Sequence, residues 1–328
     1  MGVFRYGSLC VLALTFFSGA SGSGSPLNNK LLSLVPAGAE IVAGFENYPD
    51  PHRHGQLLLT PHNNRLDLAD WQAIAGVDPK RNYQEFIEVT SSGAQQETLS
   101  EHLLLVAGSF DRERIFNATE ANGAERSQFQ SEPVMLIKPF AREKGEMTDK
   151  RWLVILDNRI GLFGTPSIVQ RALSRYAAHT DIDMPLMERL SQMPRDVSSW
   201  NVIVSAPRPD ERALVSSVSP WGRLLEDSQV LMVGARFGPK VRVDFSLHAA
   251  REHGAEFFSQ KAAFFAEVFR DEIPHVVKKW RVANVQVEAG CVRGSIEMSK
   301  QQFEMWSVQA SLPQGPKPPE QRPVSRGE

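Results

Sequence analysis

The chain has 328 residues, of which 42% are hydrophobic and 23% are charged, and its formal net charge is −2. The 36 basic and 38 acidic residues are interspersed along the chain, so no nucleic acid or anionic membrane partner is predicted. Two cysteines are too few for a small fold held together by disulfides. A hydrophobic core must therefore stabilise the fold, and the length suits two domains or two halves of one domain.

The first twenty residues have the layout of a secretory signal peptide. Arg5 supplies the positive charge, residues 9–17 form an apolar run, and residues 18–20 are small. The apolar run is shorter than the about 20 residues that span a bilayer. We therefore expect cleavage near Ala20, a periplasmic or secreted protein, and no transmembrane anchor.

Segments without a packed core are expected next to the cleavage site and at the end of the chain. Residues 21–29 (SGSGSPLNN) are rich in serine and glycine, and residues 313–328 are rich in proline and poor in apolar side chains. The first is predicted to be a flexible lead, and the second a disordered tail.

Four elements recur in the same order between these segments. The segment LSLVP (32–36) returns as LSQMP (190–194), and each copy precedes a strand-like segment. An apolar strand follows in each half, at 102–110 and at 228–237, and then a hairpin that a tryptophan opens, at 152–164 and at 280–298. The shared order predicts a duplicated unit, with a first half at 30–180 and a second half at 188–312.

The expected elements of the first half follow from apolar runs, capping residues and turn residues. In chain order they are a strand at 39–46, a helix at 66–77, a strand at 102–110, a helix at 111–123, a strand at 134–140, a hairpin at 152–164 around Asp157-Asn158, and a helix that Thr165 caps and Pro166 begins.

The second half shows the same kinds of signal. Its expected elements are a strand at 199–207, a buried strand at 228–237, a hairpin at 231–249 around Gly238-Pro239, a long helix at 253–273, a hairpin at 280–298, and a helix that Ser299 and Gln302 cap. The long helix carries an apolar stripe, which could line a lipid or cofactor pocket but is more typical of core. The stripe consists of Phe257, Phe258, Phe264, Phe265, Val268 and Phe269.

The order of strands and helices predicts an α+β fold. Neighbouring hairpins favour a mainly antiparallel sheet in each duplicated unit, with the helices on one face. The run strand–helix–strand–strand–helix also suggests a ferredoxin-like character in each half.

Three histidines cluster in YPDPHRHGQLLLTPHNN (48–64). His52 and His54 are two positions apart, which on a strand places them on one face, and His62 or Asp50 could complete a zinc or copper shell. Two prolines and a glycine around them interrupt strand pairing, however. We therefore predict a polar loop and no bound metal, with the three histidines as an outside candidate.

Cys291 is the cysteine outside the signal segment, and it follows a turn at the start of a predicted strand. No Cys-His protease signature surrounds it, so it is interpreted as a buried structural residue. Signatures of hydrolases, metalloproteases, nucleotide-binding loops and paired-cysteine sites are absent from the sequence. We therefore predict no cofactor and assign no catalytic residue.

The connection 141–151 is longer than a usual hairpin loop and is rich in charge. Binding residues collect on such loops over rigid sheets, although an idle solvated hairpin is the alternative. The binding candidates are Arg142, Glu143, Lys144, Glu146, Asp149 and Lys150.

Three stretches resemble a group of exported bacterial proteins without an established activity: LLLTPHNNRLDLADWQAIAGVD, EHLLLVAGSFDRERIF and KGEMTDKRWLVILDNRIGLFGTP. The resemblance covers most of 30–250. It implies an envelope protein and transfers no functional residues.

Three functions remain open from the sequence. Absent motifs favour a non-enzymatic exported protein that binds another envelope or extracellular protein through loops. The second is a small-ligand binder with a cleft between the halves, lined by residues such as Phe257, Phe264 and Trp280. The third is a hydrolase with an unrecognised site, for example around His52 and His54.

Overall fold

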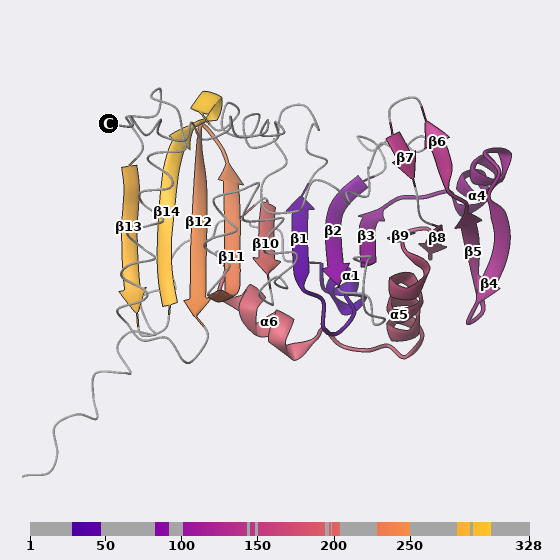
Figure 1. The fold of residues 1–328 in the computed structure, drawn as a ribbon, viewed down its shortest axis with the longest axis horizontal. Coiled ribbons are helices and arrows are strands. Elements are labelled where there is room, and N and C mark those ends of the chain that lie inside the picture. The colour runs from indigo at the N-terminus through magenta and orange to yellow at the C-terminus, as the bar shows by residue number, and fades with distance from the viewer. Residues whose placement is uncertain are drawn as a thin grey trace, which may run out of the picture.

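The fold is known from a computed structural model, which describes part of the chain. The described residues are 28–46, 83–91, 101–142, 145–147, 150–193, 197, 199–203, 228–249, 281–288 and 291–302. They form a twelve-stranded antiparallel sheet, a small two-stranded sheet and four helices (Figure 1). The predicted α+β class with a mainly antiparallel sheet is confirmed.

The elements have the following bounds. The helices are α1 (Asn29–Ser33), α4 (Arg112–Ala121), α5 (Pro166–Ala177) and α6 (Met184–Ser191). The strands before α5 are β1 (Ile41–Glu46), β2 (Tyr83–Ser91), β3 (Glu101–Gly108), β4 (Glu125–Phe129), β5 (Glu132–Ile137), β6 (Phe140–Arg142), β7 (Gly145–Met147), β8 (Arg151–Leu156) and β9 (Ile160–Gly164). The later strands are β10 (Ser199–Ile203), β11 (Ser228–Phe237), β12 (Lys240–Ala249), β13 (Arg281–Glu288) and β14 (Cys291–Ser299).

Both halves contribute strands to the large sheet in the same order. From the centre outward, the first half runs β1, β2, β3, β9, β8, and the second half runs β10, β11, β12, β14, β13. In each half the last hairpin therefore pairs through its second strand. Strands β5 and β4 extend the first half beyond this shared pattern (Figure 1).

The halves join where β1 pairs with β10. Ile41 pairs with Ile203, Ala43 with Asn201, and Phe45 with Ser199. Each β1 residue has its counterpart 158 positions later in β10, so Ile41 corresponds to Ser199 and Phe45 to Ile203. The pair of Ala43 and Asn201 lies at the centre of this two-fold relation. The same separation of 158 relates residues 32–36 to residues 190–194. The seam is thus symmetric in register.

Strand position corrects one of the sequence matches. The segments 102–110 and 228–237 became β3 and β11, but β3 is the third strand of its half and β11 is the second. By position in the sheet, β3 corresponds to β12. Apolar strands of similar length resemble one another, so the sequence likeness alone did not fix the correspondence.

The ferredoxin-like character is not confirmed. A ferredoxin-like unit contains a split βαβ, in which another strand lies between the first two. Here β1 pairs directly with β2, and β10 pairs directly with β11, both antiparallel.

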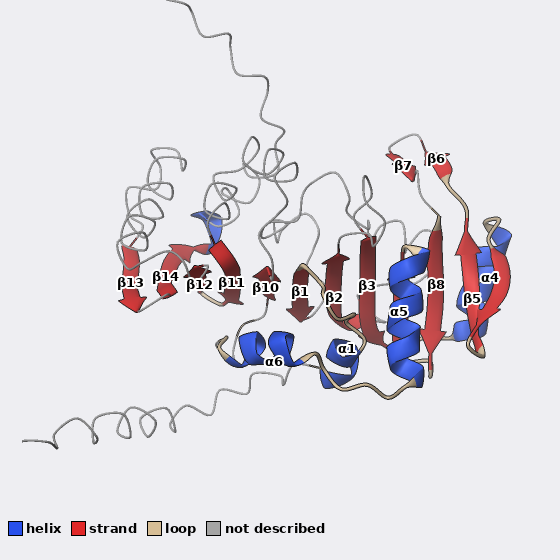
Figure 2. Ribbon diagram, turned by 60° about the horizontal axis from the view of Figure 1, so that its bottom comes forward, coloured by secondary structure: helices blue, strands red, loops and turns tan. Residues whose placement is uncertain are grey.

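The expectation that the helices lie on one face is wrong for the described helices. Helices α1, α5 and α6 cover one face, and α4 packs on the other (Figure 2). We call these the α5 face and the α4 face. On the α5 face the core includes Leu103, Leu105, Val154, Leu162, Ile168, Val169 and Leu190. On the α4 face it includes Phe86, Leu104, Val106, Ile115, Phe116 and Phe163.

Local sequence signals explain several element boundaries. The Asp111 carboxylate accepts a hydrogen bond from the Arg114 backbone N–H at 3.1 Å and so caps α4, as predicted. Asp157 and Asn158 both have positive φ, 49° and 54°, in the predicted turn between β8 and β9. At Ser299 the predicted capping box is present, because the Gln302 side chain accepts from the Ser299 N–H at 2.8 Å and Ser299 Oγ accepts from the Gln302 N–H at 3.2 Å.

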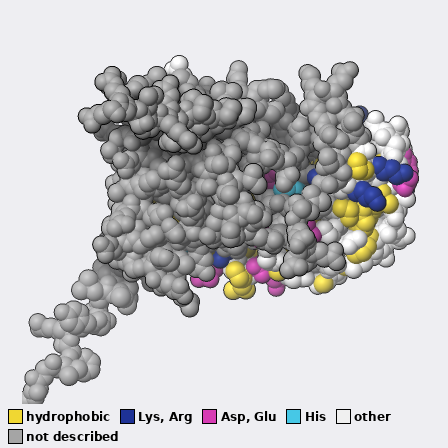
Figure 3. Space-filling view, in the orientation of Figure 1, with side chains coloured by type: hydrophobic (Ala, Val, Ile, Leu, Met, Phe, Trp, Pro, Cys, Tyr) yellow, Lys and Arg dark blue, Asp and Glu magenta, His cyan; other side chains and the backbone are white. Residues whose placement is uncertain are grey.

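The free edge of β4 carries charged side chains. Arg126 contacts Glu113 at 3.1 Å and Glu120 at 2.9 Å, and Lys138 binds Glu125. Charged side chains gather at this end of the molecule in Figure 3. Charge on an edge strand disfavours pairing with a second chain, so this edge is protected against aggregation.

The predicted loop 141–151 is partly wrong. Its first residues form β6 and β7, with Arg142 opposite Gly145, and its last residue, Arg151, is buried in β8. Strands β6 and β7 therefore pair with each other within a stretch that its charge had indicated to be loop.

Several predictions lie outside the described residues. They concern the signal peptide, the helices at 66–77 and 253–273, Trp280, the tail at 313–328 and the three clustered histidines. Among the residues that are described, no helix is both long and apolar enough to cross a membrane.

Candidate functional site

Strand β12 separates polar from apolar side chains by simple alternation. Its sequence KVRVDFSLHA places successive residues on opposite faces. The buried set is Val241, Val243, Phe245 and Leu247. The polar set on the opposite face is Arg242, Asp244, Ser246 and His248.

Pairing partners show on which face the polar set lies, because directly paired residues share a face. One row of paired residues crosses both halves. In order it contains Leu162, Leu105, Ile87, Gly44, Trp200, Gly234, Asp244 and Ser295. Asp244 therefore lies on the same face as the buried Leu105, the α5 face.

The two halves use matching positions of this face differently. In the first half Leu105 pairs with Leu162, and both are fully buried. At the same place in the second half, Ser246 pairs with Arg293. The neighbouring pair of Ala107 and Ile160 likewise corresponds to His248 and Cys291, and the pair of Leu103 and Gly164 to Asp244 and Ser295. Apolar core in one half is thus a polar stripe in the other.

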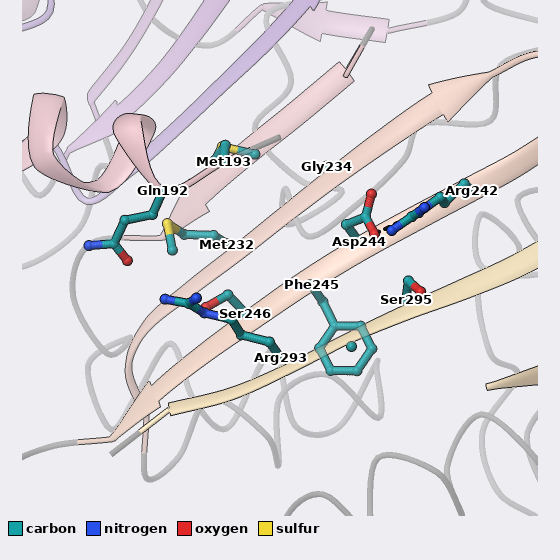
Figure 4. A pocket seen from close by; sticks show the side chains of 11 residues that line it. Gln192, Met193, Met232, Gly234, Arg242, Asp244, Phe245, Ser246, Arg293 and Ser295 are labelled. Atoms are coloured by element: carbon teal, nitrogen blue, oxygen red, sulfur yellow. Dashed lines mark hydrogen bonds and ion pairs between the residues drawn. The ribbon is translucent and has the colours of Figure 1, made fainter. Parts of the chain in front are cut away.

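A pocket of about 270 Å³ opens on this polar stripe (Figure 4). Three strands of the second half and the segment that follows α6 line it. The lining includes Met232 and Gly234 of β11, Arg242, Asp244 and Ser246 of β12, Arg293 and Ser295 of β14, and Gln192 and Met193 after α6.

A glycine lets the segment after α6 approach the sheet. A Cβ on Gly234 would lie 2.7 Å from Val197 Cγ1 and 3.3 Å from Met193 Cε, so a larger residue would push this segment away. Met193 is thereby held against β11, where it forms one wall of the pocket. This wall of the pocket is therefore fixed by the packing of the segment after α6 on β11.

An ion pair occupies one end of the pocket. The Arg242 Nε donates to Asp244 Oδ1 at 2.9 Å, and the two side chains lie together in Figure 4. The second oxygen, Asp244 Oδ2, is buried and has no hydrogen-bond partner. A buried acceptor without a partner costs about 1–3 kcal/mol of stability.

The other end of the pocket is basic. The Arg293 guanidinium lies beside Ser246 in Figure 4, and Gln192 lies on the same side. Arg189 in α6 has a buried Nη1 without a hydrogen-bond partner, and burial lowers the pKa of this guanidinium. Both arginines act on His248, whose pKa is lowered first by burial and then by the charges of Arg293 and Arg189.

A thiol, a hydroxyl and an imidazole meet next to the pocket. Ser246 Oγ lies 2.9 Å from His248 Nε2 and 3.3 Å from Cys291 Sγ, and the sulfur lies 3.6 Å from the same nitrogen. The lowered pKa favours the neutral imidazole, so Nε2 of His248 can accept a hydrogen bond from the hydroxyl or the thiol when the ring proton is on Nδ1. Cys291 is buried at the start of β14, as predicted, but it has polar partners that the sequence did not reveal.

A metal centre is not formed by these groups. Nowhere in the described part of the chain do three or more His, Cys, Asp or Glu side chains form a group that could hold a metal ion. His248 and Cys291 supply two potential ligands, whereas structural zinc takes four. The histidine candidates at 52, 54 and 62 lie outside the described residues.

The first half has a buried histidine on the α4 face instead. Thr90 Oγ1 lies 3.4 Å from His102 Nδ1, and His102 Nε2 is buried without a hydrogen-bond partner. Burial, followed by the nearby charge of Arg151, lowers the pKa of His102 to about 4. This imidazole is neutral at physiological pH.

The predicted binding residues do not line the pocket. Arg142 ends β6, Glu146 lies in β7, and Lys150 is exposed before β8. The small β6–β7 sheet lies at the opposite end of the molecule from β12 and β14 (Figure 1). Three further candidates, Glu143, Lys144 and Asp149, lie outside the described residues.

Sequence reasoning missed the pocket residues, although one signal was present. The period of two in VRVDFSLH places four polar side chains on one face of β12, and CVRGSIEM does the same for β14. Aligning these strands with LLLVAG and IGLFG of the first half would have shown polar residues at core positions. That alignment requires the strand order, which the sequence did not give correctly.

Comparison with known proteins adds no family to this geometry. The chain matches no family model, no curated protein and no solved structure. The resemblance to exported bacterial proteins therefore stays a prediction.

Proposed function

We propose that the protein is an exported binding protein that holds a small polar ligand in the pocket over β11, β12 and β14. The observation that supports this most is the exchange of core for polar residues between the halves. Leu105 and Leu162 are replaced, at the matching positions, by Ser246 and Arg293. A pocket of about 270 Å³ lies where these polar residues meet.

Energetics favour a functional reason for the polar stripe. Burying a leucine side chain stabilises a fold by about 1.5–3 kcal/mol, and a serine at the same place forgoes most of this. The partnerless Asp244 Oδ2 adds a further cost. Polar residues that lower stability are typical of functional sites, because function and stability trade off there.

We also propose that the two halves arose by duplication of one unit. Three observations support this: the shared strand order, the symmetric register at the seam, and the segments 158 residues apart. In this proposal the halves correspond to residues 30–180 and 188–312. One copy keeps an apolar α5 face, and the other carries the ligand pocket.

Export is proposed from the signal-like segment around Arg5 and residues 9–17. Intact mass measurement on protein isolated from its native cells is expected to show a chain that begins near Ser21. A cytosolic protein that retains Met1 would contradict export and leave the pocket proposal untouched.

A second function, recognition of another envelope or extracellular protein, is favoured by the position of β6 and β7. This hairpin forms a sheet of its own and stands away from the large sheet in Figure 2. Replacing residues 142–150 by a Gly-Asn turn is expected to remove envelope proteins that co-purify with the intact chain. If every partner is retained, the hairpin is a connection only.

The pocket itself is tested by filling it. In Ser246→Leu, the leucine of the first half replaces the serine and occupies the space in front of Arg293. Ligand-observed NMR with a library of small acids, bases and neutral polar compounds is expected to detect binding to the wild type and none to the variant. A library without any pocket-dependent binder would contradict the proposed function.

A further inference from the structure

We propose that the protein forms a two-fold symmetric dimer, in which strand β13 of one copy pairs antiparallel with β13 of a second copy. The inference goes beyond the proposed function and is independent of it, because it concerns the outer edge of the large sheet. It follows from the place of β13 in the strand order, from the composition of the strand and from its register with β14.

Strand β13 ends the large sheet in the second half, whereas its counterpart in the first half lies inside the sheet (Figure 1). Strand β8 occupies the matching position, and it pairs with β9 on one side and with β5 on the other. Strand β13 pairs with β14, and no strand in the described part of the chain lies on its other side. The second half therefore has a place for one more strand, and in the first half that place is filled.

The two ends of the large sheet differ in composition. At the β4 end, the ion pairs of Arg126 and Lys138 place charge along the edge, which disfavours pairing with another chain. Strand β13 has the sequence RVANVQVE, so its charged residues are the first and the last, and it contains no proline. A strand edge of this composition is a template for the addition of a further strand.

The register between β13 and β14 determines which residues of β13 share a face. Arg281 pairs with Glu297 and Glu288 with Cys291, and the register shifts by one residue between these two pairs. Glu297 and Cys291 share the α5 face, because they lie six positions apart on a strand whose pairing with β12 is regular. Arg281 and Glu288 therefore share that face as well, although residues seven apart on a regular strand lie on opposite faces.

This register makes β13 complementary to itself. When two β13 strands pair antiparallel about an axis at the centre of the strand, Arg281 of each copy lies opposite Glu288 of the other. Directly paired residues must share a face, and the shifted register places both on the α5 face. Val282 lies opposite Val287 in the same arrangement. A second copy of the strand thus matches this edge in length, face and charge.

The fold already joins its two halves by a contact of this kind. At the seam, β1 pairs antiparallel with its counterpart β10, and the pair of Ala43 and Asn201 lies at the centre of the two-fold relation. A β13–β13 pair repeats this contact between two chains and joins two twelve-stranded sheets into one. A two-fold contact between identical surfaces closes on itself, so it gives a dimer and leaves no further β13 edge.

Charge reversal tests the pairing and its register, on protein expressed in its native cells and measured by analytical ultracentrifugation. The wild type is expected to be a dimer at micromolar concentrations. Arg281→Glu and Glu288→Arg each place like charges opposite one another, so each variant alone is expected to dissociate about tenfold more readily. An equimolar mixture of the two variants places glutamate opposite arginine at both ends of the strand. The mixture is therefore expected to form a heterodimer about as tight as the wild-type dimer.

The mixture also controls for effects within one chain. Arg281→Glu places a second carboxylate opposite Glu297 of the same chain, and a second variant chain cannot reverse that change. The matched control at the other edge is Gln128→Glu, because Gln128 is an exposed residue of β4. This variant is expected to dimerise as the wild type does.

A wild-type monomer would overturn the inference, and slow amide exchange along β13 in that monomer would show that the chain covers this edge itself. A dimer that neither reversal weakens would place the contact elsewhere on the molecule. If both reversals weaken the dimer and mixing does not restore it, the two-fold pairing of Arg281 with Glu288 is wrong. Ligand binding in the pocket is tested separately, by Ser246→Leu, so either proposal can fail without the other.

Discussion

The two halves of the large sheet have the same strand order but place their polar residues on opposite faces. On the α5 face, Leu105 and Leu162 of the first half match Ser246 and Arg293 of the second. On the α4 face, the relation is reversed. There the first half has Thr90 paired with the buried His102, and the second half has the apolar pair of Ala235 and Val243.

This exchange teaches that one strand arrangement tolerates polar residues on either face, as long as the other face supplies a core. In the second half Val241, Val243, Phe245 and Leu247 are all buried on the α4 face. In the first half both faces carry buried clusters, and α5 packs on one of them. We infer that the first half contributes more to stability and the second half more to binding.

The largest expected effect comes from giving the first half the residue of the second. Leu105 is fully buried, so Leu105→Ser is expected to lower the free energy of unfolding by about 5 kcal/mol, through the lost side chain and the buried hydroxyl. The reciprocal change, Ser246→Leu, is expected to change it by less than about 1 kcal/mol. Urea unfolding monitored by circular dichroism measures both.

Equal effects of the two changes would contradict the comparison, because they would mean that both positions are core. A Leu105→Met variant serves as the control for Leu105→Ser, since it keeps the volume and apolar character. Its expected cost is less than about 1.5 kcal/mol.

The seam between the halves gives the next largest effect. The Trp200 indole ring lies over Gly44, and a Cβ on Gly44 would overlap its atoms. Trp200 is buried, so the ring cannot move without disturbing the packing, and Gly44→Ala is expected to lower the free energy of unfolding by about 3 kcal/mol.

Gly238→Ala is the matched control for the seam. The nearest atom to a Cβ on Gly238 is Lys240 O at 3.5 Å, an ordinary contact, and the residue lies in an exposed turn. Its unfolding free energy is expected to stay within about 0.5 kcal/mol of the wild type. A similarly small effect for Gly44→Ala would show that the tryptophan is not fixed at the seam.

The sequence predicts the features of the two halves that local residues determine. Turns and caps were predicted where a local residue decides them, as at Asp157-Asn158, Asp111 and Ser299. The hairpins β8–β9, β11–β12 and β13–β14 followed from apolar runs of strand length between such turns. These features need no knowledge of distant contacts.

The strand order and the pocket depend on distant pairing, and the sequence did not predict them. Nothing local states that β9 pairs with β3 or that β14 pairs with β12. Without that order, Arg242, Asp244 and Ser246 read as the solvated side of a hairpin, whereas pairing places them opposite a wall from α6. The charged run at 141–151 misled for the opposite reason, because its alternation was read as solvation and part of it is strand.

The buried histidine of the first half gives a pH dependence that the second half lacks at the matching position. The pKa of His102 falls from 6.5 to about 4 in the folded chain, so the unfolded chain binds more protons between these values. Stability from this group is present above pH 6.5 and is lost as the pH falls toward 4. The expected loss between pH 7 and pH 5 is about 2 kcal/mol.

The control for this pH dependence is a variant in which two first-half residues are replaced by those at the matching positions of the second half. In Thr90→Ala/His102→Val the first half acquires the apolar pair found at Ala235 and Val243. The difference in unfolding free energy between wild type and double variant, measured from pH 7 to pH 5, isolates the histidine. A difference that does not change with pH would show that His102 keeps an ordinary pKa.

The smallest expected effect compares the caps that follow the last hairpin of each half. Ser299 makes both hydrogen bonds of a capping box with Gln302, at 2.8 and 3.2 Å. Thr165 occupies the cap position of α5, but its hydroxyl makes no cap bond and is buried without a partner. Ser299→Ala is therefore expected to lower the free energy of unfolding by about 1 kcal/mol, whereas Thr165→Ala is expected to leave it unchanged or slightly higher. Urea unfolding of the two variants decides the matter, and Gln302→Ala should reproduce part of the Ser299→Ala loss. If Thr165→Ala costs as much as Ser299→Ala, the two helix starts are capped alike, and this difference between the halves does not exist.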